Sequence, residues 1–270
     1  MAISDISLTS GMRSNLVSLQ STVELLNRTQ ERLASGKRVN SPLDNATNYF
    51  VAKSHMDRAE DLSVRKDGMG EAIQTVKSAN EGITAITDLI ASAKGIAQSA
   101  LSAGTTERST LATQFGSIRT QIDQLAEDSG YKGTNLLDTG TLEVKFNEDG
   151  TNTLSITGFD ASTSGLAIDA AAGSWASDAN INAAIADLDA ALTTLRSEAK
   201  TLSSNLNIIT TRNSFTQGMI NVLTEGATSL TAADTNEEGA NMLMLQVRQS
   251  LGTTALSLSA QAAQSVLRLF

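Results

Sequence analysis

Apolar residues recur every three or four positions along most of this chain, and this spacing constrains the fold more than any other feature of the sequence. An N-terminal stripe consists of Met12, Leu16, Leu19, Val23, Leu26 and Leu33, with Gln30 in the one slot that lacks an apolar residue. A C-terminal stripe consists of Met244, Val247, Leu251, Ala255, Leu258, Ala262, Val266 and Leu269. Steps of three and four residues add up to the seven-residue repeat of helices that pack along a narrow seam. Both ends of the chain are therefore predicted to be long helices.

The middle of the chain repeats this pattern in three further helical segments. They span about 45–103, about 107–128 and a run that includes 185–209. Their apolar positions are Leu62, Met69, Ile73, Val76, Ile83, Ile86, Ile90, Ala93 and Ala97, then Leu111, Phe115, Ile118, Ile122 and Leu125, then Ile185, Leu188, Leu192, Leu195, Ala199, Leu202, Leu206 and Ile209. We interpret these stripes as the core of one bundle, because most such stripes are buried within their own chain.

A segment of different composition separates the two helical halves of the chain. Residues 129–180 are rich in Gly, Thr, Ser, Asn and Asp, and within them 142–146 and 153–157 alternate apolar with polar residues. Because Asp149-Gly150 lies between these two runs, we predict a β-hairpin near 140–158, followed by an irregular loop. The predicted fold class is mainly α, with long antiparallel helices that form a coiled-coil-like bundle from both chain ends and one small β-hairpin region in the middle. A chain that runs out and back in helices should place its two ends side by side.

Composition excludes several partner classes. Aromatic residues make up only 3% of the chain and its net charge is −9, which argues against binding to nucleic acid or to anionic membrane surfaces. Cysteine is absent, which excludes disulfides and thiolate chemistry. No stretch approaches the roughly 18 apolar residues of a membrane helix, so we expect no membrane insertion. The first residues lack a basic start followed by an apolar run, so we expect no cleaved signal peptide and export by another route.

No arrangement of residues resembles a catalytic, cofactor-binding or metal-binding site. His55 is the only histidine, and no neighbouring motif supplies a nucleophile or an orienting acid, so we interpret it as a surface or interface residue. Three pairs of adjacent acidic residues lie at 60–61, 127–128 and 237–238. The two members of each pair point to different faces of their helix, so we expect them on solvated faces or in salt bridges between subunits. Gly68 and Gly70 follow no strand, so close helix packing or a bend explains them better than a phosphate loop. We expect no enzyme, no metal and no cofactor.

The only proline of the chain lies in the stretch 33–46, LASGKRVNSPLDNA, between two helical segments. Gly36 is suited to end the first helix in the left-handed conformation. Ser41, Pro42 and Asp44 fit an N-cap, a first-turn proline and a capping-box acid for the next helix. These local features are compatible with two interpretations of the stretch. It is either an ordinary turn between helices or a hinge that separates two independently packed layers.

The same stretch resembles a family. Ser35-Gly36-Lys37-Arg38-Val39-Asn40-Ser41, followed by Asp44 and Ala46, is similar to the S-G-x-R-I-N-S-A-x-D-D-A segment of bacterial flagellins. Further resemblances follow in order at 130–137 (GYKGTNLL), 185–195 (IADLDAALTTL) and 251–270 (LGTTALSLSAQAAQSVLRLF). Pro42 replaces the usual alanine, and Asn45, Thr47 and Asn48 replace an acid, an alanine and a glycine. The longer members' variable outer domains have no counterpart here.

The resemblance implies how the chain is divided. Residues 1–40 and 235–270 are expected to form an inner terminal-helix domain that lines the channel of a filament. Residues 41–234 are expected to form an outer helical bundle with the hairpin. Gly36, Arg38, Asn40, Ser41, Pro42 and Asp44 then form the inter-domain connector.

The resemblance also implies a function, that of a structural subunit that polymerises into the bacterial flagellar filament and serves motility. Two helices alone bury too little surface to offset the entropy of ordering them, so we expect the terminal helices to be frayed until they fold against neighbouring subunits, with the two stripes as the polymerisation seam. Expected partners are identical copies, hook-associated proteins, the filament cap, an export chaperone and the flagellar type III export apparatus, and the expected location is extracellular. A hook-filament junction protein with flagellin-like termini is the alternative.

Overall fold

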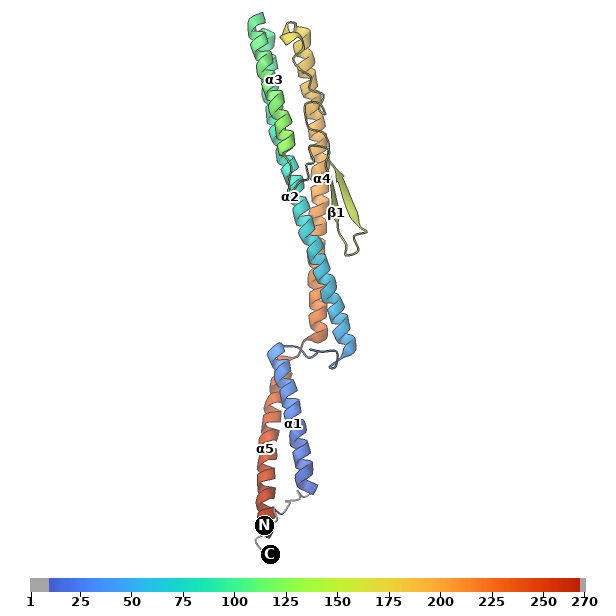
Figure 1. Cartoon of the computed structure of the whole chain (residues 1–270), viewed down its shortest axis with the longest axis vertical. Coiled ribbons are helices and arrows are strands. Elements are labelled where there is room, and N and C mark those ends of the chain that lie inside the picture. Colours follow the sequence, from blue (N-terminus) through green and yellow to red (C-terminus); the bar gives the residue numbers. More distant parts are fainter. Residues whose placement is uncertain (1–9, 268–270) are drawn as a thin grey trace, which may run out of the picture. The chain divides into compact units, whose positions relative to one another are not determined.

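The structure is a computed structural model that describes residues 10–267. Its elements are α1 (Ser10–Ser35), α2 (Ala46–Ser102), α3 (Thr105–Asp128), β1 (Thr141–Lys145), β2 (Thr153–Thr157), the short 3-10 helix η1 (Ala172–Trp175), α4 (Asp178–Thr231) and α5 (Thr235–Leu267) (Figure 1). The predicted mainly α fold with one small antiparallel hairpin is confirmed. The bounds of α2 and α3 lie within two residues of the sequence-based ranges, whereas α4 extends beyond the 185–209 run in both directions, to Asp178 and Thr231.

The chain forms two compact units. One comprises the residues up to Asp57 together with those from Val222 onward, and the other comprises Arg58–Asn221. We call them the terminal unit and the bundle unit. Helices α2 and α4 each run through this boundary, so the connector between α1 and α2 belongs with the terminal helices in this division. The division into filament layers at 40/41 and 234/235 concerns the assembled state and stays a prediction.

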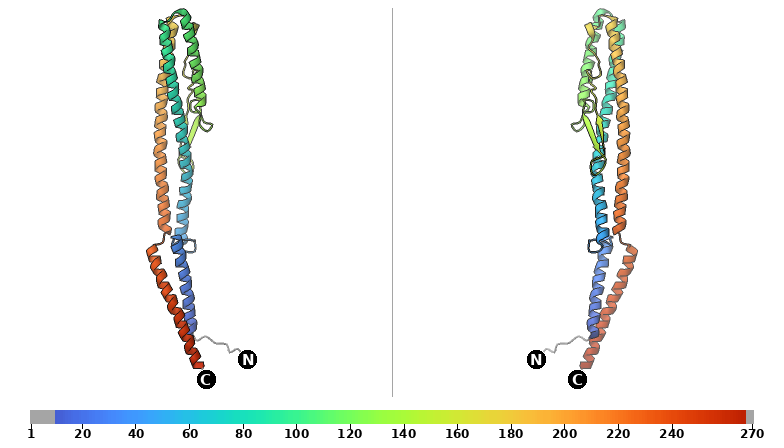
Figure 2. Two further views of the ribbon diagram at one scale, coloured as in Figure 1. Left: turned by 90° about the vertical axis from the view of Figure 1, so that its left-hand side faces the viewer. Right: turned by 90° about the vertical axis from the view of Figure 1, so that its right-hand side faces the viewer.

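The core of the bundle unit is aliphatic, as the stripes predict. Helices α2, α3 and α4 run alongside one another, with α3 folding back along α2 (Figure 2), and their stripes meet in one buried cluster. Of the predicted stripe positions, those buried in this cluster are Met69, Val76, Ile83, Ile86, Ile90, Ala93, Ala97, Phe115, Ile122, Leu188, Leu195, Leu202 and Ile209. The ring of Phe115 contacts that of Trp175 from η1, with centroids 4.9 Å apart. Trp175 is fully buried and is the only tryptophan of the chain.

The hairpin packs its apolar residues onto this bundle. β1 pairs with β2 antiparallel, with Val144 opposite Leu154 and Leu142 opposite Ile156. Val144 and Ile156 are buried while their strand neighbours are exposed, which is the alternation expected of a strand with one covered face. In the turn Gly150 has a φ of +67°, a conformation that glycine adopts without strain.

The terminal unit contains the helix pair that the sequence predicts. Helices α1 and α5 lie side by side, from opposite ends of the chain (Figure 1). Thr22 and Thr29 of α1 and Leu245 of α5 are buried in the unit. A Cβ added to Gly252 would lie 2.5 Å from Leu19 Cδ1, so this glycine lets α1 approach α5 closely. The expected pairing of the two chain ends is confirmed.

Candidate functional site

The connector between α1 and α2 is held by backbone hydrogen bonds to the junction between α4 and α5. Gly36 ends α1 with a φ of +67°, as predicted. The N–H of Arg38 donates to the carbonyl of Thr231 over 2.7 Å, and the N–H of Ala233 donates to the carbonyl of Gly36 over 3.0 Å. These bonds join two segments about 195 residues apart in the sequence, so the connector is a fixed part of the terminal unit.

The start of the second helical segment at about 45 is confirmed, whereas the predicted N-cap at Ser41 is wrong. Ser41, Pro42 and Asp44 form a separate turn, closed by the Asp44 N–H donating to the Ser41 carbonyl over 3.1 Å. Helix α2 begins at Ala46, and its N-cap is Asn45, whose Oδ1 accepts a hydrogen bond from the N–H of Asn48 over 2.9 Å. The error arose because the Asp44 carboxylate accepts from the Ser41 N–H, which is one half of a capping box, without a helix following.

Asp44 stabilises this turn through one carboxylate oxygen. Its Oδ2 accepts hydrogen bonds from the N–H groups of Asn40 and Ser41, over 3.1 and 3.0 Å, and from the Ser41 hydroxyl over 3.2 Å. These donors hold the pKa of the Asp44 carboxyl below its ordinary value, with the Ser41 N–H as the largest cause. The carboxylate is therefore ionised at neutral pH.

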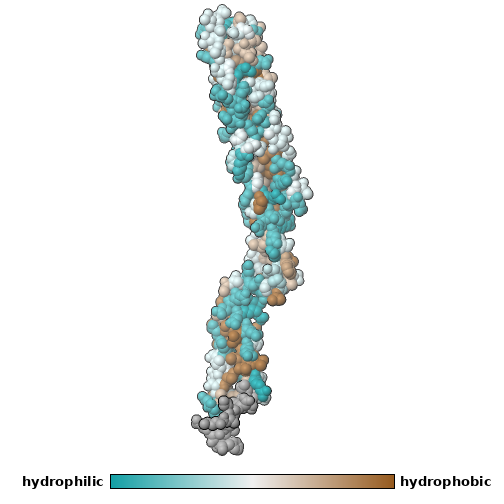
Figure 3. All heavy atoms as spheres, viewed as in Figure 1, coloured by the Kyte–Doolittle hydropathy of each residue, from teal (hydrophilic) through white to brown (hydrophobic). Residues whose placement is uncertain are grey.

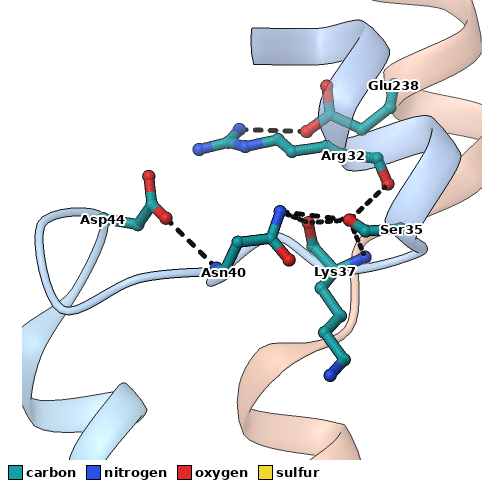
Figure 4. Close-up of polar contacts among 6 residues, drawn as sticks. All are labelled: Arg32, Ser35, Lys37, Asn40, Asp44 and Glu238. Atoms are coloured by element: carbon teal, nitrogen blue, oxygen red, sulfur yellow. Dashed lines mark hydrogen bonds and ion pairs between the residues drawn. The ribbon is translucent and has the colours of Figure 1, made fainter.

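Asn40 links the turn to the end of α1. Its Nδ2 donates to the Ser35 hydroxyl over 3.0 Å and to the Lys37 carbonyl over 3.4 Å (Figure 4). The side chain of Lys37 points away from this network (Figure 4). Of the predicted connector residues, Gly36, Asn40, Ser41, Pro42 and Asp44 shape the backbone, whereas Arg38 contributes its backbone and leaves its side chain exposed.

An ion pair between α1 and α5 was not predicted from the sequence. Arg32 Nη1 lies 3.0 Å from Glu238 Oε1 (Figure 4). Glu238 is 7% exposed, so the interpretation of 237–238 as a solvated or inter-subunit acidic pair is wrong for this residue. Arg32 Nε is buried and has no hydrogen-bond partner among residues 10–267. The only sequence signal was the place of Glu238 in the first turn of α5, where an acid suits the helix dipole.

The N-terminal stripe faces inward along part of α1. Met12 is buried, and Leu19, Val23 and Leu26 are partly buried. Leu16 and Leu33 are exposed, and so is Val17, which lies outside the stripe. The structure therefore brings most of this stripe into the terminal unit and leaves its edge uncovered.

The C-terminal stripe lies on the face of α5 that turns away from its buried face. Met244, Val247, Leu251 and Leu258 are between 52% and 65% exposed. Ala255 and Ala262 are also exposed. The side chain of Val266 and the whole of Leu269 lie outside what the structure describes. We call the exposed stripe, Met244, Val247, Leu251, Ala255, Leu258 and Ala262, the outer stripe of α5.

A second face of the same helix carries the intrachain contact. Leu245 is 5% exposed, and Gly252 and Leu256 follow it at steps of seven and four residues and are partly buried. At about 100° per residue, Leu251 lies about 120° around the helix from Leu245, so one helix presents two separate apolar faces. Sequence reasoning missed the inner face because it includes Gly252 and Gln249, which do not read as apolar.

Apolar side chains consequently reach the surface of the terminal unit. Figure 3 shows brown spheres, for hydrophobic residues, along the terminal helices on the face in view. Contiguous exposed apolar surface of this kind marks a site of interaction with another molecule, because monomeric soluble proteins rarely expose such patches.

The remaining candidate features are metal-ligand groups, membrane helices, His55 and the glycines Gly68 and Gly70 of α2. Among residues 10–267, no three His, Asp or Glu side chains lie where they could hold a metal ion, and no helix in the same range is long and apolar enough to cross a membrane. His55 is partly buried on α2, close to Gly226 of α4. A Cβ added to Gly68 or Gly70 would meet nothing within 4 Å, so the expectation of close helix packing there is wrong.

Known proteins resemble this chain along its whole length. Residues 3–141 match a family described as the bacterial flagellin N-terminal helical region. Flagellin FljM of Caulobacter vibrioides is 30% identical over 274 residues, which cover all of both chains. A flagellin of Brucella melitensis is 30% identical over 267 residues, covering 94% of this chain and 95% of its own. Among solved structures, the flagellin of Bacillus cereus covers 55% of this chain and 88% of its own, with a TM-score of 0.49 and 18% identity.

Proposed function

Because this chain belongs to the bacterial flagellin family, whose members are structural subunits of the flagellar filament, we propose that it polymerises through the outer stripe of α5 together with the exposed edge of the N-terminal stripe. Identical copies are its principal partner. The contact is heterologous, since the surface offered by one copy meets a different surface of the next, and such contacts propagate a helix and do not close a ring.

The observation that carries the proposal is that α5 has two separate apolar faces, of which one is buried within the chain and the other is exposed. Its inner face, with Leu245, is covered within the chain, while Met244, Val247, Leu251 and Leu258 on the outer stripe remain more than half exposed. Burying a large aliphatic side chain stabilises an interface by about 1.5–3 kcal/mol when the burial is complete. Four such side chains on one narrow stripe supply a driving force for association without any contribution from the bundle unit.

Assembly is coupled to folding of the terminal unit. Helices α1 and α5 contact each other through one narrow seam that contains threonine and glycine as well as leucine. Two helices joined this way bury little apolar surface relative to the entropy of ordering about 60 residues. Their order is completed when copies cover the outer stripe, and the connector, residues 36–44, joins this inner domain, 1–40 and 235–270, to the outer domain, 41–234.

Family membership supports the finer features of the proposal. The protein acts without catalysis, outside the cell, after export by the flagellar type III apparatus with an export chaperone and without a cleaved signal peptide. In the filament it adjoins hook-associated proteins and the cap. The relatives named above are flagellins, and nothing in the structure favours a hook-filament junction protein.

Seeded polymerisation of the purified protein tests the proposal. We expect long filaments by electron microscopy, and we expect Leu251→Asp to abolish them while the circular dichroism of the monomer stays helical. An exposed position of the bundle unit, Val64→Asp, serves as the control because it lies outside both stripes. Filaments of normal length from Leu251→Asp would contradict the assignment of the outer stripe as the polymerisation surface. Short oligomers in place of long filaments from the parent protein would contradict its proposed function as a filament subunit.

A further inference from the structure

Leu43 is the most exposed large apolar side chain among the described residues, at 97%. Leu43 lies in a turn whose backbone is fixed by hydrogen bonds. Pro42 fixes the backbone before it, and Asp44 closes the turn with three hydrogen bonds from Asn40 and Ser41. The turn therefore presents one leucine to solvent in a defined position, although a polar residue would serve the turn equally well.

The same terminal unit contains a groove large enough to take such a side chain. Its volume is 260 Å³, and it lies between the connector and the adjoining ends of α2 and α4. Val39, Tyr49, Ala52, Met56 and Ala227 form its apolar lining. Leu43 of the same chain is not part of this lining and stays exposed, so the groove is not filled from within. We call it the connector groove.

The charges beside the leucine and beside the groove are opposite. Asp44, next to Leu43, accepts its hydrogen bonds through Oδ2, and its Oδ1 accepts none within the part of the chain that the structure describes. The charged residues that line the connector groove are Lys37, Lys53 and Asp57. Lys53 and Asp57 pair with each other over 3.1 Å, whereas the ammonium group of Lys37 forms no ion pair with any residue in 10–267. A carboxylate beside a leucine thus matches an ammonium group beside an apolar groove.

We propose that Leu43 of one copy inserts into the connector groove of the next copy, where Asp44 meets Lys37 of that copy. The inference rests on the proposed polymerisation and names one contact within it. Because knob and groove are different surfaces of one molecule, the contact is heterologous and continues from copy to copy. It lies on α2, α4 and the connector, and it is separate from the outer stripe of α5.

The critical concentration for polymerisation measures the contact. Leu43→Ala should raise it about tenfold, which corresponds to the loss of most of a buried leucine side chain. Val64→Ala is the matched control, because Val64 is also exposed but belongs to the bundle unit and lies outside the groove. Lys37→Glu should also raise the critical concentration, whereas Lys37→Arg should leave it within about twofold. Equal values for Leu43→Ala and the parent protein would overturn the proposal.

Cross-linking tests the geometry directly, since the chain has no cysteine of its own. Filaments are assembled from an equal mixture of Leu43→Cys and Met56→Cys chains and treated with a short bifunctional thiol reagent. We expect covalent dimers from the mixture and none from either variant alone, nor from Leu43→Cys mixed with Gln124→Cys, an exposed position on α3. The double variant Leu43→Cys/Met56→Cys should give a ladder of multimers.

Each outcome separates the inference from the function it rests on. Filaments that form from the mixture but yield no cross-linked dimers would refute the Leu43 contact without affecting the proposed polymerisation. Dimers without higher multimers from the double variant would also refute it, because they indicate a closed, two-fold contact. Failure of the parent protein to polymerise would refute the proposed function, independently of any cysteine variant.

Discussion

Replacing Leu258 by aspartate separates the stability of the single chain from the stability of the polymer. Leu258 is 62% exposed on the outer stripe, so the substitution removes little intrachain burial and should change the free energy of unfolding of the monomer by no more than about 0.5 kcal/mol. The monomer should keep its helical circular dichroism spectrum and its melting temperature.

The effect on the polymer is much larger. About 60% of the leucine surface is still to be buried, worth about 1–2 kcal/mol at each interface. An uncompensated carboxylate in an apolar contact adds at least about 2 kcal/mol more. Together these losses amount to about 3 kcal/mol or more, which raises the critical concentration more than about 100-fold.

Sedimentation of seeded samples over a range of concentrations measures that quantity. Ser257→Asp is the matched control, since it adds the same charge one residue away, about 100° around the helix and off the outer stripe. A critical concentration of Leu258→Asp equal to that of Ser257→Asp would refute the assignment of the polymerisation surface. A monomer that unfolds on substitution would refute the argument from exposure.

Three further substitutions test individual contacts. Glu238→Ala leaves the half-buried Arg32 without its ion-pair partner and should lower the stability of the helix pair by about 1–3 kcal/mol, seen as faster amide hydrogen exchange in α1, whereas Glu238→Asp should retain part of it. Gly36→Ala places a side chain at a φ of +67° with no neighbouring atoms to clash, so the backbone alone should cost about 1 kcal/mol in the thermal melt, and Gly36→Asn should cost less. The Arg58 guanidinium, donating a hydrogen bond to Glu148, lowers the pKa of that carboxyl below its ordinary value. A lowered pKa stabilises the fold at pH values above the unfolded pKa, and this contribution is lost as the pH falls through the folded pKa. Glu148→Gln should therefore lower the melting temperature at pH 7 and lower it progressively less as the pH falls below the ordinary carboxyl pKa. A difference that does not shrink in acid would contradict the ion pair.

The regular parts of this fold follow from the sequence because one physical cause dominates each of them. In α2 the stripe from Met69 to Ala97 is buried almost without exception, since the three-and-four spacing puts these residues on the face that α3 and α4 cover. The hairpin strands lie within a residue of their predicted ranges, because alternation and the Asp149-Gly150 turn agree.

The parts that were missed depend on residues far apart in the sequence or on competing local contacts. Glu238 is buried because Arg32 lies opposite it, 206 positions away, and no pattern in either helix encodes that pairing. The inner face of α5 contains Gly252, whose role is to admit Leu19, and a glycine carries no hydropathy signal. The N-cap of α2 was misplaced at Ser41 because Asn45 is an equally suitable cap by residue type, and only Asn45 is followed by a continuous helix.

Amide hydrogen exchange on the monomer and on the filament tests the central claim most directly. In dilute monomer we expect the amides of α1 and α5 to exchange orders of magnitude faster than those of α2 between Ile83 and Ala97, which are buried in the bundle core. In the filament the α1 and α5 amides should become as slow as those of α2, because copies then cover the outer stripe. Terminal helices that are equally protected in the dilute monomer and in the filament would contradict the claim that assembly completes their folding.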